Sequence, residues 1–365
     1  MPDGRPLRIA AHNGAPVWGG AEIATARLLA GLAGRGHRVI LYCNDPEVAR
    51  RAALLGAPTR LLHLGGDIAL HHAFRLAYRL RRDRPDVLLL GTFRKIWLGA
   101  LAATLARVPR VVARIGLETD MPRNVKYRFV FRYWIDAIVF NADGMRRAFL
   151  ESMPGLADRA ATIHTGVAPP APGGGAAFRA ELGIPDGAPL AGSVGRLATQ
   201  KRYDRLVRAL GSLPGVHAVV VGEGGERKAL EELARECGVA GRFHLPGHRE
   251  DLTAALDAMD VFVLCSDREG LSNAMLEALA AGVPVVSTDV SGAREALAPR
   301  RDGSTPGRVI GFEEAELADA LAALLNAPDE RGRMREAAHR VARERFGEER
   351  MLDAWERVLG GARAP

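Results

Sequence analysis

Two glutamates lie eight positions apart in the stretch SDREGLSNAMLEALAAGVPVV, which covers residues 266–286. A carboxylate can accept hydrogen bonds from two neighbouring hydroxyl groups of a sugar ring. The free N–H groups at the start of a helix suit an oxygen of a phosphate or a sugar. Glu269 and Glu277 therefore suggest a site for a ligand that carries hydroxyls and phosphate, although a loop-capping Glu269 and a solvated Glu277 would give the same pattern.

The segments around these glutamates predict a loop at one edge of a sheet. The run DVFVLCS at 260–266 is apolar throughout and of strand length, as expected for a strand buried on both faces of a parallel sheet. Ser272 can cap a helix over NAMLEALAAG that ends at Gly282. A second buried strand follows, so the segment predicts a βαβ unit with Glu269 in the loop and Glu277 about one turn inside the helix. Open α/β sheets bind ligands at such an edge.

Two cations occupy a second predicted strand end, in GSVGRLATQKRYD at 192–204. Arg196 follows a strand, and Lys201 comes five residues later, just before an amphipathic helix. An arginine fork and a lysine point charge can hold a diphosphate without a metal. Ordinary surface cations are the competing interpretation. Together with the two glutamates, these cations fit a nucleotide sugar.

Glycines mark two further loops. Gly222 lies in VVVGEGGER, a shortened dinucleotide fingerprint without its third glycine, which favours a close backbone approach to a ligand over a dinucleotide site. Gly20 lies in HNGAPVWGGAE, directly ahead of a predicted helix, where the backbone can approach a substrate without interference from a Cβ atom. A plain tight turn would explain the second motif equally well.

Strands and helices alternate in both halves of the 365-residue chain, which predicts two doubly wound parallel sheets. The Pro/Gly segment GVAPPAPGGGA cannot sustain a helix or a strand and is typical of an interdomain linker. After Asn326 the sequence is helical and charged. We therefore predict four parts: a first domain at 1–168, a linker at 169–175, a second domain at 176–345 and a final helical segment at 346–365.

Composition limits the class of protein. With 48% apolar and 25% charged residues the chain is typical of a globular protein. No apolar run reaches the roughly 18 residues that a membrane helix needs. The amino end shows no signal segment, and the three cysteines are odd in number, so a reducing cytoplasm is expected. Motifs of the C-x-x-C or H-E-x-x-H kind are absent, so no metal site is predicted.

Charge is divided unevenly between the two halves. Residues 1–170 carry a net charge of +12, and residues 171–365 a net charge of −5. The basic half contains apolar and aromatic residues mixed with arginines at 94–110 and 121–134. This composition favours reversible docking of the first domain on an anionic membrane, at the inner face of the cell membrane, although a core helix with an arginine face is the alternative. No nucleic-acid-binding motif accompanies the charge, so nucleic acid is not an expected partner.

Taken in order, these motifs resemble the retaining glycosyltransferases of family 4, which have the α/β fold called GT-B. The resemblance is strongest from Gly192 to Glu295, and EGLSNAMLEALAAGVPVVSTDVSGAREAL carries most of it. It implies two Rossmann-like domains facing a cleft, with the acceptor in the first, the nucleotide mainly in the second, and a last helix that returns to the first domain. It also implies transfer of a sugar from a UDP- or GDP-linked donor to a hydroxyl of a glycan or a lipid-linked acceptor, with no other cofactor.

The resemblance assigns roles to individual residues. Arg196 and Lys201 would bind the donor diphosphate, and Glu277 the ribose hydroxyls. Gly20 would lie by the phosphates, and Gly222 in the donor site. Glu269 would hold the transferred sugar together with the backbone of four consecutive residues, Gly270, Leu271, Ser272 and Asn273.

One departure from the family pattern concerns the first domain. Members commonly have a histidine just after the strand that corresponds to RVVAR, whereas this chain continues RIGLETD. Arg114 could stabilise the departing phosphate, and Glu118 or Asp120 could orient an acceptor hydroxyl. His12 is a further candidate on the acceptor side. The missing histidine leaves a non-catalytic GT-B partner subunit open as a rival function. A GT-B sugar-nucleotide epimerase is a second rival, because it uses a similar nucleotide site, but the acid and base carboxylates that it needs are not evident in the sequence.

Overall fold

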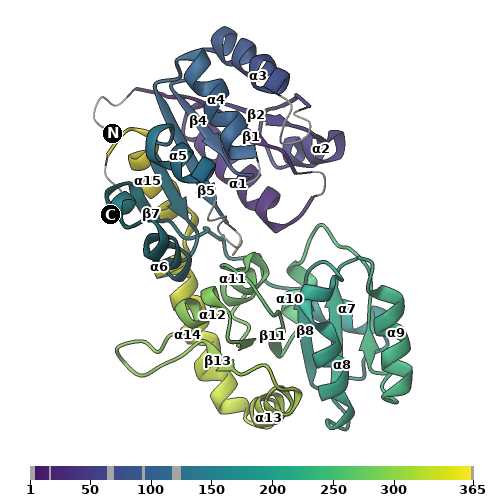
Figure 1. Cartoon of the computed structure of the whole chain (residues 1–365). Coiled ribbons are helices and arrows are strands. Elements are labelled where there is room, and N and C mark those ends of the chain that lie inside the picture. The colour runs from purple at the N-terminus through teal and green to yellow at the C-terminus, as the bar shows by residue number, and fades with distance from the viewer. Residues whose placement is uncertain (1–4, 16–17, 64–69, 93–94, 117–124, 363–365) are drawn as a thin grey trace. The chain divides into compact units, whose positions relative to one another are not determined.

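The computed structural model describes residues 5–15, 18–63, 70–92, 95–116 and 125–362. The chain divides into two compact units, each with its own sheet (Figure 1). Unit 1 comprises Met1–Gly166 and Glu348–Pro365, and unit 2 comprises Val167–Gly347. Gly166 is the last residue of unit 1 before the chain enters unit 2, and the chain re-enters unit 1 at Glu348.

Unit 1 is a parallel sheet covered by helices. Its strands follow the order β3-β2-β1-β4-β5-β6-β7, and every neighbouring pair is parallel. The strands are β1 (Arg8–Asn13), β2 (Arg38–Cys43), β3 (Thr59–Leu61), β4 (Val87–Leu90), β5 (Arg110–Ile115), β6 (Ala137–Phe140) and β7 (Ala160–Thr162). The helices are α1 (Gly20–Gly34), α2 (Pro46–Leu54), α3 (Leu70–Asp83), α4 (Ile96–Ala106), α5 (Val125–Tyr133), α6 (Asp143–Ser152), the 3-10 helix η2 (Pro154–Arg159) and α15 (Glu348–Leu359).

Unit 2 repeats this architecture with six parallel strands in the order β10-β9-β8-β11-β12-β13. The strands are β8 (Leu190–Val194), β9 (His217–Val221), β10 (Phe243–His244), β11 (Val261–Leu264), β12 (Val285–Thr288) and β13 (Gly307–Ile310). The helices are α7 (Gly175–Glu181), the 3-10 helix η3 (Thr199–Lys201), α8 (Tyr203–Gly211), α9 (Arg227–Glu236), α10 (Thr253–Ala258), α11 (Asn273–Ala280), α12 (Ser291–Ala296), α13 (Glu314–Leu325) and α14 (Pro328–Phe346).

The last helix, α15, belongs to unit 1. Its Trp355 is buried in the same apolar core as residues of α1 and α2. Arg35, at the end of α1, donates a hydrogen bond of 2.7 Å to Asp353 and one of 3.0 Å to Glu356. The approach is close, because a Cβ atom at Gly166 would lie 2.7 Å from the Cα atom of Glu348. The predicted return of the final helix to the first domain is therefore confirmed.

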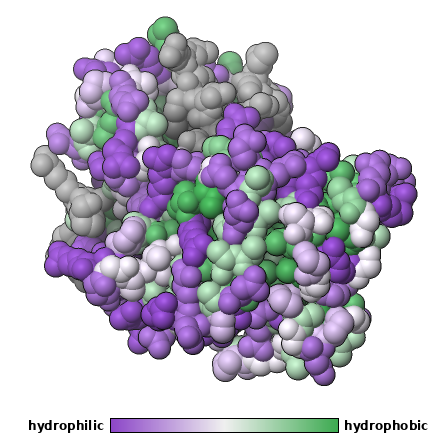
Figure 2. Space-filling model, turned by 90° about the horizontal axis from the view of Figure 1, so that it is seen from below, coloured by the Kyte–Doolittle hydropathy of each residue, from purple (hydrophilic) through white to green (hydrophobic). Residues whose placement is uncertain are grey.

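Unit 2 has a continuous apolar core between its sheet and helices α8, α9 and α13. Helix α8 forms there because its apolar residues recur at helical spacing and one face packs into the core. Leu206, Val207 and Leu210 on that face are all fully buried. Hydrophilic residues dominate the face shown in Figure 2, with apolar residues in small groups between them. The prediction of two doubly wound parallel α/β domains is confirmed.

Three short edge strands, β3, β7 and β13, were not predicted from the sequence. Another difference concerns the predicted linker at 169–175, because its last residue, Gly175, begins α7 and donates a hydrogen bond of 2.9 Å to Asp257. Helix α4 covers the longest apolar run, and Ile96, Leu98 and Ala103 in it are fully buried. Residues 94–110 therefore supply a core helix rather than an exposed membrane-docking segment. No helix in the described residues combines the length and apolarity needed to cross a membrane.

Candidate active site

The strand order of unit 2 reverses between β8 and β11, which lie side by side. Successive connections from β8 lead to β9 and β10 on one side, and from β11 to β12 and β13 on the other. At such a point the loops from two neighbouring strands diverge and leave room for a ligand at the carboxyl end of the sheet. Lys201, the last residue of η3 in the connection after β8, and Glu269, in the loop after β11, both lie at this point.

Lys201 and Glu269 form an ion pair in which the lysine Nζ contacts the glutamate Oε1. Ser266 also donates to Oε1 at 3.2 Å. Glu269 is buried, and a buried carboxylate is stable only when it is paired and hydrogen bonded. Both described hydrogen bonds reach Oε1, so the lone pairs of Oε2 can accept from a ligand. Lys201 carries three N–H donors and uses one of them on Glu269.

Glycine backbone borders the lysine. A Cβ atom at Gly195 would lie 3.6 Å from the Lys201 Nζ and only 2.7 Å from the Tyr203 hydroxyl. A Cβ atom at Gly222 would lie 1.9 Å from the Gly195 carbonyl oxygen, which no side chain can tolerate. Gly222 is thus required by the chain's own packing, because the loops after β8 and β9 touch there. Its contact with a donor stays a prediction.

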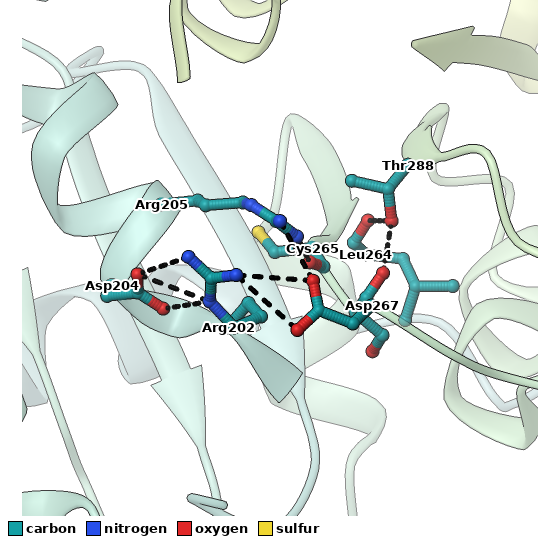
Figure 3. Close-up of polar contacts among 8 residues, drawn as sticks. Arg202, Asp204, Arg205, Leu264, Cys265, Asp267 and Thr288 are labelled. Carbon is teal, nitrogen blue, oxygen red and sulfur yellow. Dashed lines mark hydrogen bonds and ion pairs between the residues drawn. The ribbon is translucent and has the colours of Figure 1, made fainter. Parts of the chain in front are cut away.

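A network of ion pairs ties the loop after β8 to the loop after β11 (Figure 3). Asp267 accepts from Arg205 at 2.8 Å and from Arg202 at 3.2 Å. The buried Arg205 also donates to the Cys265 carbonyl at 2.8 Å. Because Arg202 directly follows Lys201 and Asp267 lies two residues before Glu269, this arginine–aspartate latch holds the Lys201–Glu269 pair in place.

The loop after β11 is also fixed from β12. The Thr288 hydroxyl donates to the Ser266 carbonyl at 2.8 Å and lies 3.2 Å from that of Leu264 (Figure 3). The backbone of Gly270 is in close contact with α12, since a Cβ atom at Gly292 would lie 2.2 Å from the Gly270 carbonyl oxygen. The loop that contains Glu269 is therefore held rigidly before any ligand arrives.

Helix α11 begins as the sequence predicts. Ser272 is its N-cap and accepts from the Met275 amide at 3.5 Å. Gly282 follows the helix in the left-handed conformation, at φ +76°. Glu277 lies one turn inside α11 and is half-buried. Leu271 and Ser272 are buried, whereas Asn273 is half-buried.

Arg196 is exposed just beyond β8. Its guanidinium makes no hydrogen bond or ion pair with another residue that the structure describes. An unpaired arginine at this sheet edge is available to an anionic ligand, in contrast to Arg202 and Arg205, which the latch already neutralises. The candidate site of unit 2 thus combines one free cation, one paired cation and one buried carboxylate.

The corresponding reversal in unit 1 lies between β1 and β4. His12, near the carboxyl end of β1, is buried, and its ring Nε2 lies 3.3 Å from the Asn44 Oδ1. Burial lowers the His12 pKa to about 4, partly offset by the hydrogen bond to Asn44. The imidazole is therefore neutral near pH 7. Thr92, just after β4, accepts from the Gly14 amide at 2.9 Å and ties the loop after β1 to its neighbour.

Arg114 is buried on β5 and directed at helix α1. It donates to the Thr25 hydroxyl at 3.0 Å and contacts the Ala21 carbonyl at 3.4 Å. Burial lowers its pKa to about 10, and the nearby carboxylate of Glu22 opposes this shift. Burial likewise raises the Glu22 pKa, and the Arg114 charge is one of the influences that lower it. The buried Arg114 and the half-buried Glu22 therefore interact electrostatically near the start of α1, where Gly20 is the first residue.

The predicted site residues of unit 1 have different outcomes. His12, Gly20 and Arg114 lie at the carboxyl ends of the strands or at the start of α1, whereas Glu118 and Asp120 lie outside the described residues. Sequence reasoning missed Glu22 in unit 1, and Ser266 and Asp267 in unit 2. Asp267 and Ser266 flank the predicted strand end, a position that could have identified them. Within the described ranges, no group of three or more His, Cys, Asp or Glu residues could hold a metal ion.

Comparison with known proteins identifies the class of this chain. Residues 176–341 match the family described as glycosyl transferases group 1, and residues 18–169 match glycosyltransferase family 4. The chain is 31% identical over 345 residues to the lipopolysaccharide core biosynthesis glycosyltransferase LpsE of Rhizobium meliloti. The match covers 93% of this chain and 96% of LpsE. The chain therefore belongs to glycosyltransferase family 4, as the sequence motifs predict.

Two further likenesses accord with this assignment. A GDP-mannose-dependent alpha-mannosyltransferase of Mycobacterium tuberculosis is 29% identical over 92% of this chain and 91% of its own length. The crystal structure of Anabaena Alr3699/HepE in complex with UDP superposes with a TM-score of 0.85 at 19% identity, covering 97% of this chain and all of that one. At this identity the likeness shows the fold alone, which is GT-B.

Proposed function

We propose that this protein is a retaining glycosyltransferase that moves a sugar from a nucleoside-diphosphate sugar to a hydroxyl of a glycan or a lipid-linked acceptor. The observation that carries the proposal is the Lys201–Glu269 pair at the strand-order reversal of unit 2, with the exposed Arg196 on the same loop as Lys201. HepE has been crystallised with UDP and with UDP-glucose, and the mannosyltransferase is named for GDP-mannose, so both bases remain candidates here.

The donor diphosphate binds to Arg196 and to the two remaining N–H donors of Lys201. Each charge-assisted hydrogen bond contributes about 1.5–3 kcal/mol. Glu269 accepts from a hydroxyl of the transferred sugar through Oε2, and the backbone from Gly270 to Asn273 borders that sugar. Glu277 accepts from the ribose hydroxyls. Arg196 and Lys201 place two cations at the two phosphates, although the Glu269 carboxylate offsets part of this charge, and we propose a reaction that needs no metal.

The reaction retains the anomeric configuration by attack from the face that the diphosphate leaves. The acceptor oxygen bonds to the anomeric carbon as the bond to the phosphate oxygen breaks, and the acceptor proton passes to that departing oxygen. No protein nucleophile takes part. The cations lower the barrier because the diphosphate gains negative charge as it leaves, and the latch holds Lys201 in place before the donor binds.

The acceptor hydroxyl is assigned to unit 1. His12 is neutral near pH 7 and even more buried than Arg114, so its role in this proposal is to place an uncharged group beneath the acceptor hydroxyl. Arg114 is too buried to be the first contact of a phosphate, so its role in this proposal is to hold the start of α1 and Gly20. The proposed location is the cytoplasm, with reversible association at the inner face of the cell membrane where the acceptor is lipid-linked.

Incubating the purified protein with a panel of UDP- and GDP-sugars tests the proposal. A transferase slowly hydrolyses its own donor when the acceptor is absent, and releases a sugar with the anomeric configuration of the donor. An epimerase would convert the nucleotide sugar into an isomer, and a non-catalytic partner subunit would leave every donor unchanged. Either of these results would replace the proposed activity with the corresponding alternative.

A further inference from the structure

Two helices of unit 1 expose apolar side chains along one stripe each. On α3 the stripe is Leu70, Phe74 and Tyr78, and on α5 it is Val125, Phe129 and Tyr133. The six residues are between 48% and 79% exposed. Spacing of four residues keeps each set on one helix face.

Both helices also have a buried face that packs against unit 1, so the exposed stripes are additional apolar surfaces and not the faces that hold the helices in the fold. Helix α3 buries Ala73, Leu76 and Leu80 against the unit, and α5 buries Val130 and Phe131. Helix α4 lies between α3 and α5 and contacts both, as Figure 1 shows. The two stripes therefore flank a common core helix on one side of the sheet.

Cations accompany both stripes. Helix α3 contains four arginines, and its only acidic residue is the terminal Asp83, which pairs with Arg60. Helix α5 contains one lysine and two arginines and no acidic residue. Arg75, Arg79, Arg128 and Arg132 form no ion pair with another described residue. Phe129 is held by Tyr133 and Trp134, with ring centroids 4.9 Å and 5.4 Å away.

We infer that the outer faces of α3 and α5 form one docking surface for an anionic lipid bilayer. Exposed aromatic and aliphatic side chains enter the interface, while the neighbouring arginines stay at the level of anionic headgroups. A second copy of the chain would bring two cationic faces together, which costs free energy. A nucleic acid would use the arginines but would leave Leu70 and Val125 without a function.

This inference deepens the proposed function, because it names the surface by which a transferase with a lipid-linked acceptor reaches its membrane. It does not depend on turnover, since binding is measured without donor or acceptor. It also differs from the sequence prediction, which placed docking partly on the run that the structure buries as α4.

Co-sedimentation with phosphatidylcholine vesicles, with and without phosphatidylglycerol, tests the inference. The full chain should bind only the anionic vesicles, and added salt should weaken binding by screening. Reversing Arg75 and Arg79 to Glu should lower binding about 25-fold or more, since each cation near an anionic surface contributes about fivefold. Replacing Phe74 and Tyr78 by Ser, or Phe129 and Tyr133 by Ser, should lower it about tenfold each.

Matched controls lie on helix α2, which packs in the core formed by α1 and α15. Leu54, the last residue of α2, and Leu55, directly after it, are 67% and 39% exposed, and Arg50 and Arg51 allow the same change of charge. Substituting these pairs by Ser or Glu should leave vesicle binding within about threefold of the parent. Donor hydrolysis by every variant shows whether the transferase site is intact, so loss of docking is distinguished from loss of activity.

Four outcomes would overturn the inference. They are equal binding to neutral and anionic vesicles, no binding to either, equal losses in the α2 controls, and a dimer in light scattering that the α3 or α5 serine variants convert to a monomer. The last outcome would assign the face to a second copy of this chain. Retention of nucleic acid by the parent but not by the arginine-reversed variant, without vesicle binding, would assign it to nucleic acid.

Discussion

The two units present opposite electrostatic environments at the same topological position. In unit 2 the strand-order reversal between β8 and β11 carries an exposed Arg196 and a Lys201–Glu269 pair. In unit 1 the reversal between β1 and β4 carries a buried, neutral His12, and the buried Arg114 interacts electrostatically with the half-buried Glu22 at the start of α1. Among the described residues, Arg196 is exposed at the edge of unit 2, whereas His12 and Arg114 are buried at the edge of unit 1.

This difference shows that fold alone does not decide which ligand binds at a sheet edge. Both loops obey the rule for doubly wound sheets. Among the described residues, Arg196 and Lys201 of unit 2 can meet a diphosphate at low cost in desolvation, because Arg196 is solvated and Lys201 keeps free donors. Unit 1 instead suits an uncharged hydroxyl group. Four substitutions test this difference between the two units.

The largest effect is expected for Lys201→Ala. Removing a charge-assisted contact to the diphosphate should lower kcat/KM for the donor by about tenfold to 150-fold. Steady-state donor hydrolysis measures the loss, and Lys228→Ala, on the exposed side of α9, is the matched control. The Lys201→Ala substitution also leaves the buried Glu269 carboxylate unpaired. The double variant Lys201→Ala with Glu269→Gln removes that unpaired charge, so it shows whether the loss of activity comes from misfolding. Kinetics within about threefold of the parent would contradict the assignment.

Arg205→Met should destabilise unit 2. Methionine keeps the packing but leaves the buried Cys265 carbonyl without its donor and removes the ion pair to Asp267. We expect the free energy of unfolding to fall by about 2–3 kcal/mol in urea denaturation. Arg208→Met on the same helix removes only an exposed pair to Glu314 and should cost less than about 1 kcal/mol. Equal losses in both variants would show that the latch does not hold the loop.

His12→Gln should make stability less sensitive to acid. The pKa of His12 is about 4 in the folded chain and about 6.5 when unfolded, so the unfolded state binds the proton more readily between these values. Its contribution to stability is therefore complete above about pH 6.5 and is lost as pH falls toward 4. The parent should lose about 2 kcal/mol through His12 between pH 7.5 and pH 5, and the variant should lack this part. Identical pH profiles in chemical denaturation would place His12 in a solvated site.

Glu277→Ala should weaken nucleoside diphosphate binding about tenfold, because the ribose hydroxyls lose a charged acceptor. Isothermal titration calorimetry with UDP and with GDP measures the change. Glu232→Ala, exposed on α9, is the control and should bind as the parent does. An unchanged Kd in the Glu277 variant would show that Glu277 does not bind the ribose hydroxyls.

Sequence reasoning predicted local structure better than contacts between distant residues. It predicted helix α11 with its Ser272 cap, because cap chemistry and the apolar spacing of Met275 and Leu276 lie within a few residues. It also predicted Lys201 and Glu269 as site residues on the strength of the family resemblance, but not their ion pair. That pair joins positions 68 residues apart, and it depends on β8 and β11 being neighbours, which hydrophobic periodicity does not encode.

The remaining differences have similar physical causes. The structural roles of Arg205 and Arg114 could not be predicted from the sequence, because the chain contains 46 arginines and nothing in the sequence separates a buried arginine from an exposed one. The edge strands β3 and β7 have three residues each and are too short to show a period. The exposed stripe on α3 was missed because the same helix has a strong apolar face, which alone explains its pattern.

Hydrogen–deuterium exchange with saturating UDP or GDP tests most directly whether unit 2, and not unit 1, holds the diphosphate. If unit 2 holds the diphosphate, the backbone amides at 194–202 and 266–277 should exchange more slowly with nucleotide than without it. In the Lys201→Ala variant the same nucleotide concentration should not slow their exchange. Amides at 8–15 should exchange as in the free protein. Slower exchange at 18–25 without any change at 194–202 would place the nucleotide in unit 1 and contradict the account.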